Sequence, residues 1–192
     1  NFSTSTQTLS LPMILSGTRD FNASNGAITV NGALSGVGGL TKFGSKTLTL
    51  TASNSYDGVT TVSNGLLAIY HSNALGSTNG NTWIDCSSGG YLQLYNDIQV
   101  PEPLTFNGYR GGAYTLQNAS GSNTLNGALT LLQSGFRLSV PSGTTLVVGG
   151  GVKSSSDIIL NNGGTLVFNN TPLNLGGGAF YVDGSGGTVA VG

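Results

Sequence analysis

One short phrase recurs along almost the whole chain and limits what the chain can fold into. It consists of a Gly or Asn turn, a small or polar residue and then an apolar–x–apolar triplet, at intervals of 15 to 25 residues. The apolar pairs are Ile28/Val30, Leu48/Leu50, Leu67/Ile69, Leu92/Leu94, Tyr114/Leu116, Leu129/Leu131, Leu146/Val148, Leu166/Phe168 and Val189/Val191. Repetition at such a period is typical of a solenoid, whose repeats bury their apolar faces against their neighbours.

The alternation inside each phrase indicates β-strands. Apolar residues occupy every second position, which places them on one side of an extended backbone. A second apolar set falls between the first, at Val59/Val62, Ile84, Leu104/Phe106, Leu125, Leu138/Val140, Ile158/Leu160 and Phe180/Val182. No window shows apolar residues at helical spacing, so we expect an all-β chain with two strands in each repeat.

Short strands with one apolar face need neighbouring repeats to be stable. Two strands and their corners in roughly 20 residues match one rung of a parallel β-helix. We therefore predict a parallel β-helix (solenoid) of about nine rungs over residues 16–192, with strands roughly 4.8 Å apart along the axis. A β-sandwich or antiparallel barrel remains the alternative, because the chain contains several Asn-Gly pairs that suit tight hairpins.

The composition agrees with a rod of short strands and many corners. Gly, Ser, Thr and Asn make up half of the chain, and 38% of the residues are hydrophobic. The net charge is −1, and no cluster of Lys or Arg exists that could neutralise phosphates, which argues against nucleic-acid binding. No run of 18 apolar residues predicts a transmembrane segment, and Leu9–Leu15 is too short for a signal peptide.

The sequence offers few residues for metal, cofactor or nucleophilic chemistry. Cys86 is the single cysteine, and its alternation with Ile84 predicts a buried apolar side chain. His71 is the single histidine and precedes a turn, so we expect an exposed side chain. No calcium-loop pattern is present. We predict no metal site and no cofactor.

Residues 38–77 contain a series of short phrases in a fixed order. They are Gly39-Leu40-Thr41-Lys42, Thr47-Leu48-Thr49-Leu50, Asn54-Ser55-Tyr56-Asp57-Gly58-Val59-Thr60-Thr61-Val62, Asn64-Gly65-Leu66-Leu67 and Ala74-Leu75-Gly76. In order and spacing they resemble the autotransporter-associated β-strand repeat of bacterial passenger domains, over about a fifth of the chain. The resemblance implies a right-handed β-helix that is exported to the cell surface or beyond, as part of a longer chain.

The two ends of the sequence differ from the repeat. Residues 1–15 do not fit it, and we expect them to form a cap or a strand that is exchanged with a neighbour. The last phrase, residues 187–192, reads as the middle of a repeat without a polar cap. We therefore expect a segment of a larger passenger, or a subunit that stacks end to end into a filament.

Parallel β-helices also carry enzymes that act on polysaccharides, which need a pair of carboxylates across the scissile bond. Asp85 and Glu102, 17 residues apart, are the best acidic pair that adjacent rungs could bring together. Asp57 and Asp183 each precede a Gly and read as corner residues, whereas Glu102 lies between two prolines. We predict no catalytic residues, with a polysaccharide lyase or glycosidase as the alternative.

Tyrosines mark a candidate binding surface. If Leu67/Ile69 and Leu92/Leu94 stack, Tyr70 and Tyr95 are neighbours along the axis and point outward. Tyr91 shares the outward face with Tyr95, and Tyr109 lies near the adjacent loop. Exposed aromatic rings beside amides and hydroxyls can stack on sugars or form protein contacts, although simple packing between rungs is the favoured explanation.

These observations predict a non-enzymatic, extracellular structural or adhesive segment. Low net charge and open β edges favour self-association, and cell-surface or matrix polysaccharide is the other expected partner. The alternative function is a β-helix that binds or degrades polysaccharide.

Overall fold

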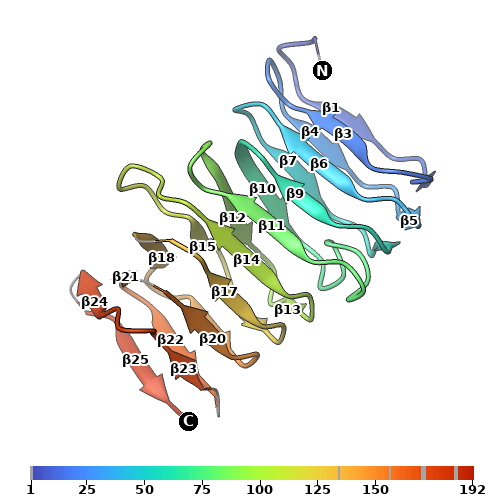
Figure 1. Cartoon of the computed structure of the whole chain (residues 1–192). Coiled ribbons are helices and arrows are strands. Elements are labelled where there is room, and N and C mark those ends of the chain that lie inside the picture. Colours follow the sequence, from blue (N-terminus) through green and yellow to red (C-terminus); the bar gives the residue numbers. More distant parts are fainter. Residues whose placement is uncertain (1, 134, 156, 170–171, 184–185) are drawn as a thin grey trace.

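The chain forms a coil of short strands around one axis. The computed structural model describes residues 2–133, 135–155, 157–169, 172–183 and 186–192, and none of these is helical. The N-terminus and the C-terminus lie at opposite ends of the stack (Figure 1).

Four parallel sheets form three sides of the coil. The nine-stranded sheet contains β1 (Gln7–Leu9), β4 (Ile28–Val30), β7 (Leu48–Leu50), β10 (Gly65–Ile69), β12 (Gly90–Leu94), β15 (Leu116–Asn118), β18 (Phe136–Val140), β21 (Ile158–Asn162) and β24 (Phe180–Asp183). The eight-stranded sheet contains β3 (Arg19–Asn22), β6 (Leu40–Phe43), β9 (Thr60–Val62), β11 (Thr82–Asp85), β14 (Leu104–Asn107), β17 (Leu129–Leu131), β20 (Val152–Ser154) and β23 (Leu173–Asn174).

The third side is divided between two sheets. The three-stranded sheet contains β2 (Met13–Ile14), β5 (Leu34–Gly36) and β8 (Ser55–Tyr56). The five-stranded sheet contains β13 (Gln99–Val100), β16 (Ser122–Leu125), β19 (Thr145–Val148), β22 (Thr165–Phe168) and β25 (Thr188–Val191). Between them, residues 70–81 cross this side through turns, and Ala74 and Leu75 fill the interior in place of a strand.

This architecture confirms the predicted parallel β-solenoid. Every pairing between the described strands is parallel, which excludes the antiparallel sandwich or barrel. The described strands make about eight circuits, with β24 and β25 beginning a further one, close to the expected nine. The right-handed sense that the resemblance implies stays a prediction.

The apolar ladder holds in register through the first half of the chain. Val30 pairs with Leu50, Leu50 with Ile69, and Ile69 with Leu94, so successive circuits are 20, 19 and 25 residues long. All four side chains are at most 1% exposed. Full burial of a Val, Ile or Leu side chain contributes about 1.5–3 kcal/mol, so this ladder is a major part of the core.

The second half of the predicted ladder is wrong. Leu92, and not Leu94, pairs with Leu116, so the expected register is displaced by two residues. Leu129/Leu131 belong to the eight-stranded sheet and Leu146/Val148 to the five-stranded sheet. The physical reason is that most circuits contain three strands, and the predicted two strands per repeat miss the shortest ones. Because all three sides use the same apolar–x–apolar phrase, the sequence pattern does not tell them apart.

Buried asparagines hold one corner of the coil. The Asn54 side chain accepts a hydrogen bond from the Leu34 amide at 2.8 Å and donates to the Ala74 carbonyl at 2.6 Å. It thereby connects three successive circuits. Asn123 accepts from the Ile98 amide at 2.8 Å in the same way. Each side chain satisfies backbone groups that no strand partner reaches at the corner.

The N-terminal region joins the solenoid. Gln7–Leu9 pair with Ile28–Val30, and Met13 pairs with Leu34, so residues 7–14 contribute two strands to the first circuit. A role of residues 1–15 as a cap or an exchanged strand, and the division at residue 16, stay predictions.

Candidate ligand-binding surface

Tyr70 and Tyr95 lie one above the other at the exit of the nine-stranded sheet. Their ring centroids are 4.3 Å apart and the ring planes differ by 6°, so the rings are stacked. The stack follows from the register, because the Tyr70 amide donates to Leu50 and the Tyr95 amide donates to Ile69. Each ring therefore covers one face of the other.

Amide side chains continue this surface along the sheet. The Tyr95 hydroxyl donates to Gln93 Oε1 at 2.8 Å, and Gln93 Nε2 donates to Gln117 Oε1 at 2.5 Å. Partial burial, and then the neighbouring Tyr70, raise the pKa of the Tyr95 phenol above its ordinary value. The phenol therefore stays a neutral donor over the physiological range.

Tyr91 belongs to a second group at the other end of β12. The guanidinium carbon of Arg110 lies 3.9 Å from the centroid of the Tyr91 ring. Arg110 also donates to the carbonyls of Tyr114 at 2.9 Å and Gly89 at 3.2 Å. It thus fixes the loop 108–115 against the sheet, and one face of Tyr91 is occupied by this cation–π contact.

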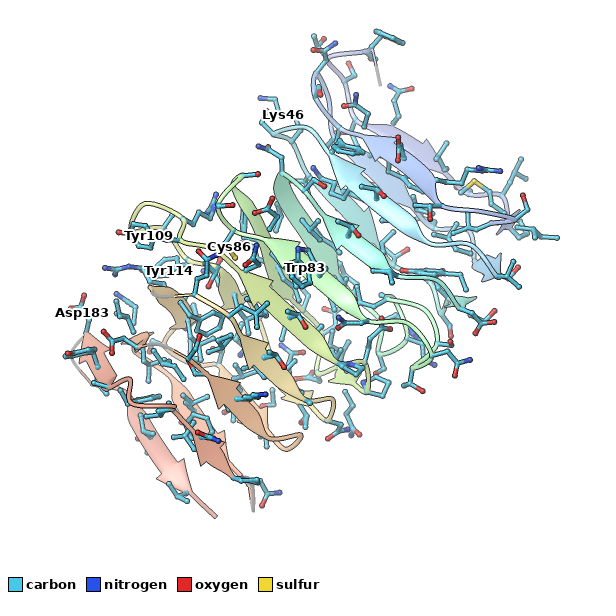
Figure 2. All side chains as sticks on the ribbon, viewed as in Figure 1. Lys46, Trp83, Cys86, Tyr109, Tyr114 and Asp183 are labelled. Atoms are coloured by element: carbon cyan, nitrogen blue, oxygen red, sulfur yellow. The ribbon has the colours of Figure 1, made fainter. Side chains whose placement is uncertain are left out.

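Tyr109 lies in the loop 108–115, away from the Tyr70–Tyr95 stack. Figure 2 shows Tyr109 and Tyr114 on this loop. The Tyr109 ring is 51% exposed and rests against Gly135 of the next circuit, where any Cβ would collide with it. Tyr95 follows Tyr91 by four positions, about 13 Å along an extended strand. Of the four predicted tyrosines, the structure therefore brings only Tyr70 and Tyr95 together in a stack.

The structure does not bring Asp85 and Glu102 together. Asp85 is in register with Asn107, at the end of β11, whereas Glu102 contacts Thr82 at the beginning of that strand. The Asp85 carboxylate accepts hydrogen bonds from Ser87 and Ser88, which lower its pKa against the opposing effect of burial. Its oxygens hold the adjacent turn.

The remaining candidates have structural partners. Asp57 accepts from Ser77 Oγ at 2.7 Å and from Asn79 Nδ2 at 3.0 Å, which lowers its pKa and closes a corner. His71 Nδ1 accepts from the Asn73 amide at 3.1 Å. Gly184, which follows Asp183, lies outside the described residues.

Cys86 is fully buried, as its alternation with Ile84 predicts. Burial raises the pKa of its thiol to about 12, so the reactive thiolate is scarce at neutral pH.

Sequence reasoning missed a buried carboxyl group. Glu102 is 2% exposed; its Oε1 accepts from the Thr82 hydroxyl at 3.2 Å, and its Oε2 has no partner among the described residues. Burial raises its pKa to about 8, against the opposing effect of Thr82. Nearby, the hydroxyls of Tyr56 and Thr60 share a hydrogen bond of 2.5 Å. The flanking prolines had suggested an irregular loop, not a buried side chain.

Sequence reasoning also missed a buried cation. Lys42 takes the inward position between Phe21 and Val62 in the eight-stranded sheet and is fully buried. Its ammonium donates to the carbonyls of Phe43 at 2.9 Å, Gly44 at 2.5 Å and Asn64 at 2.7 Å. Burial lowers its pKa to about 8. Lys42 therefore closes a corner between two circuits.

No group of three His, Cys, Asp or Glu side chains within the described ranges could hold a metal ion. In the same part of the chain, there is no helix with the length and hydropathy of a membrane span.

Comparison with known proteins identifies one family. Residues 40–69, from β6 to the end of β10, match the passenger-associated-transport-repeat family. No curated protein and no solved structure shows a significant match. The matched residues form more than one full circuit of the solenoid, through the five consecutive strands β6 to β10. The predicted resemblance is thereby confirmed for this segment: residues 40–69 match a passenger-associated-transport repeat.

Proposed function

We propose that this chain is a non-enzymatic structural segment of a bacterial passenger protein, held outside the cell as a stiff β-helical rod. The observation that carries the proposal is the unbroken series of parallel pairs from β1 to β24, built over one continuous apolar core. Stacked backbone bonds give such a rod its length and stiffness. The family match at residues 40–69 supports the location outside the cell.

The location is tested on intact cells that produce the full protein. Mild protease treatment should release peptides of this chain into the medium while a cytoplasmic marker stays intact. Recovery of these peptides only after cell lysis would contradict an extracellular rod.

The non-enzymatic role is tested with purified protein and purified glycans. Incubation with uronic-acid and neutral polysaccharides should leave their chain length unchanged, as measured by size-exclusion chromatography. Chain shortening that disappears in Asp85→Asn would instead support the polysaccharide-degrading alternative.

Polysaccharide binding by Tyr70, Tyr91, Tyr95 and Tyr109 is the second candidate function. Its support is the partly exposed outer row of Tyr70, Tyr95, Gln93 and Gln117, which combines aromatic rings with amides. Adhesion through this row predicts glycan-array signals that fall in Tyr70→Ala and Tyr95→Ala. Signals that both variants retain would exclude the row.

We also propose that the open strand edges associate. β1 and β24 are the outer strands of the nine-stranded sheet. A further circuit, supplied by the same protein or by a second copy, would form hydrogen bonds with the backbone groups on their open edges. Analytical ultracentrifugation should then show reversible oligomers that grow with protein concentration. A single monomeric species at high concentration would contradict end-to-end stacking.

A further inference from the structure

A straight row of outward side chains runs along the eight-stranded sheet. Strand register places its members next to one another, and alternation turns them away from the buried ladder. From the N-terminal end they are Asp20, Thr41, Thr61, Trp83, Thr105, Thr130, Lys153 and Asn174. Adjacent members are about 4.8 Å apart, the spacing of strands in a sheet. The row is thus a track of threonines, one aromatic ring and one cation, with an acidic and an amide side chain at its two ends. Thr105 is the buried member, and its hydroxyl accepts a hydrogen bond from Asn81 Nδ2 at 3.3 Å.

Trp83 is the only tryptophan of the chain and lies in the middle of this track. Figure 2 shows it on the outer face of the sheet, and its side chain is partly exposed, whereas Thr82 and Ile84 on either side are buried. Packing of the core does not require an indole at an outward position, because threonine occupies the positions directly above and below. A partly exposed indole beside the partly exposed Thr61 combines an apolar ring face with a polar neighbour, as sugar recognition requires.

The same sheet is hollowed further along the track. One hollow of about 360 Å³ and another of about 240 Å³ both include Thr130, Lys153 and Asn174 in their lining. The first extends toward the beginnings of these strands and the second toward their ends, so together they flank the exposed Lys153 side chain. Three strand spacings, about 14 Å, separate Trp83 from Lys153. This span accommodates a few linked sugar rings.

The charges along the track favour an acidic ligand at its C-terminal part. Lys153 has no ion pair among the described residues and is the single cation of the row. The carboxylate of Asp20 lies at the other end, three strands beyond Trp83. The second carboxylate on this side, Asp85, is on the strand of Trp83, three strands from that of Lys153.

We propose that the outer face of the eight-stranded sheet, from Trp83 to Lys153, binds a linear acidic glycan. One sugar ring stacks on Trp83, a sugar hydroxyl bonds to Thr130, and a uronic-acid carboxylate pairs with Lys153. The inference deepens the proposed function, since a rod outside the cell meets such glycans. It does not depend on the tyrosine row, which lies on the nine-stranded sheet.

The test is titration calorimetry of the purified chain with oligogalacturonate, and with dextran as a neutral probe. We expect binding of oligogalacturonate that weakens with salt, and much weaker binding of dextran. Trp83→Ala should weaken the affinity about tenfold, the loss of one aromatic contact, and Trp83→Phe should weaken it less. Lys153→Gln should weaken it up to about fivefold and reduce the salt dependence.

Control variants outside the track distinguish binding at this surface from nonspecific binding and from loss of structure. Gln99→Ala on the five-stranded sheet and Lys46→Gln at an exposed corner should leave the affinity unchanged. Circular dichroism should show native β-structure in every variant, because all four side chains lie outside the core. The proposal is overturned by absent binding, by equal binding of dextran, or by Lys46→Gln acting like Lys153→Gln. Each of these results would leave the structural role of the rod, tested by protease treatment of cells, unaffected.

Discussion

The buried carboxyl of Glu102 gives the solenoid a stability that depends on pH. Its Oε2 has no partner among the described residues, and the groups around it are the hydroxyls of Thr82, Tyr56 and Thr60. None of these carries a charge that could compensate a carboxylate. The protonated form is therefore favoured in the folded chain, and the pKa rises from an ordinary 4.5 to about 8.

The sign and size of the effect follow from this shift. Because the folded pKa lies above the unfolded one, the folded chain binds more protons between them, and stability falls as the pH rises. Each pKa unit is worth about 1.4 kcal/mol, so the loss between pH 5 and pH 8 is at most about 3.5 kcal/mol. Relaxation of the protein around the ionised carboxylate reduces this to about 2–3 kcal/mol.

The assay is urea unfolding at pH 5 and pH 8, followed by circular dichroism. Wild type should lose about 2–3 kcal/mol of unfolding free energy between the two pH values. Glu102→Gln, which has the same shape and does not titrate, should be nearly independent of pH in this range. The comparison ends at pH 8 because the pKa of Lys42 is lowered to about 8. Above this pH, the deprotonation of Lys42 makes the unfolding free energy rise with pH, which would oppose the effect of Glu102. A flat wild-type profile, or an equal loss in Glu102→Gln, would refute the reasoning.

Three further predictions concern contacts at the corners of the coil. Lys42→Met should lower the unfolding free energy by about 2–3 kcal/mol, because buried carbonyls lose their donor; urea titration should show no comparable loss in the exposed control Lys46→Met. Asn54→Ala should cost about 2–3 kcal/mol in the same assay, since two backbone groups lose their partner, and the exposed Asn25→Ala should be neutral. Arg110→Gln should accelerate cleavage of the loop 108–115 by chymotrypsin, because the loop loses the contacts of Arg110 with Tyr91 and Tyr114. An unchanged cleavage rate would show that Arg110 does not hold the loop.

The sequence predicted the period and the inward face of this fold, because both follow from alternation. Ile28, Leu48, Leu67 and Leu92 do stack in register, since these circuits have similar lengths and clear turn signals. The predicted register of the apolar ladder is wrong from Leu116 onward, because the loop 108–115 lengthens the corner before β15. Strands of only two residues, such as β13, carry too little alternation to be recognised.

The site was less predictable than the fold, for a different reason. Register placed Tyr70 beside Tyr95 but did not indicate that the rings would cover each other. Glu102 and Lys42 are charged residue types that composition assigns to the surface, and each is buried because of contacts formed by other circuits. The proposed role of Trp83 depends on strand register, which places it within a row of threonines.

The central claim is that each circuit lies parallel and in register on the one before it. Thr29 and Thr49 face outward as direct partners, and a strand spacing of about 4.8 Å lies within the Cα range of a disulfide. In a Cys86→Ala background, Thr29→Cys with Thr49→Cys should form an intramolecular disulfide under mild oxidation, detected by mass spectrometry, without loss of β-structure. Thr29→Cys with Ser63→Cys, from different sides of the coil, should not. Failure of the first pair to cross-link, or equal cross-linking of both, would contradict the coil.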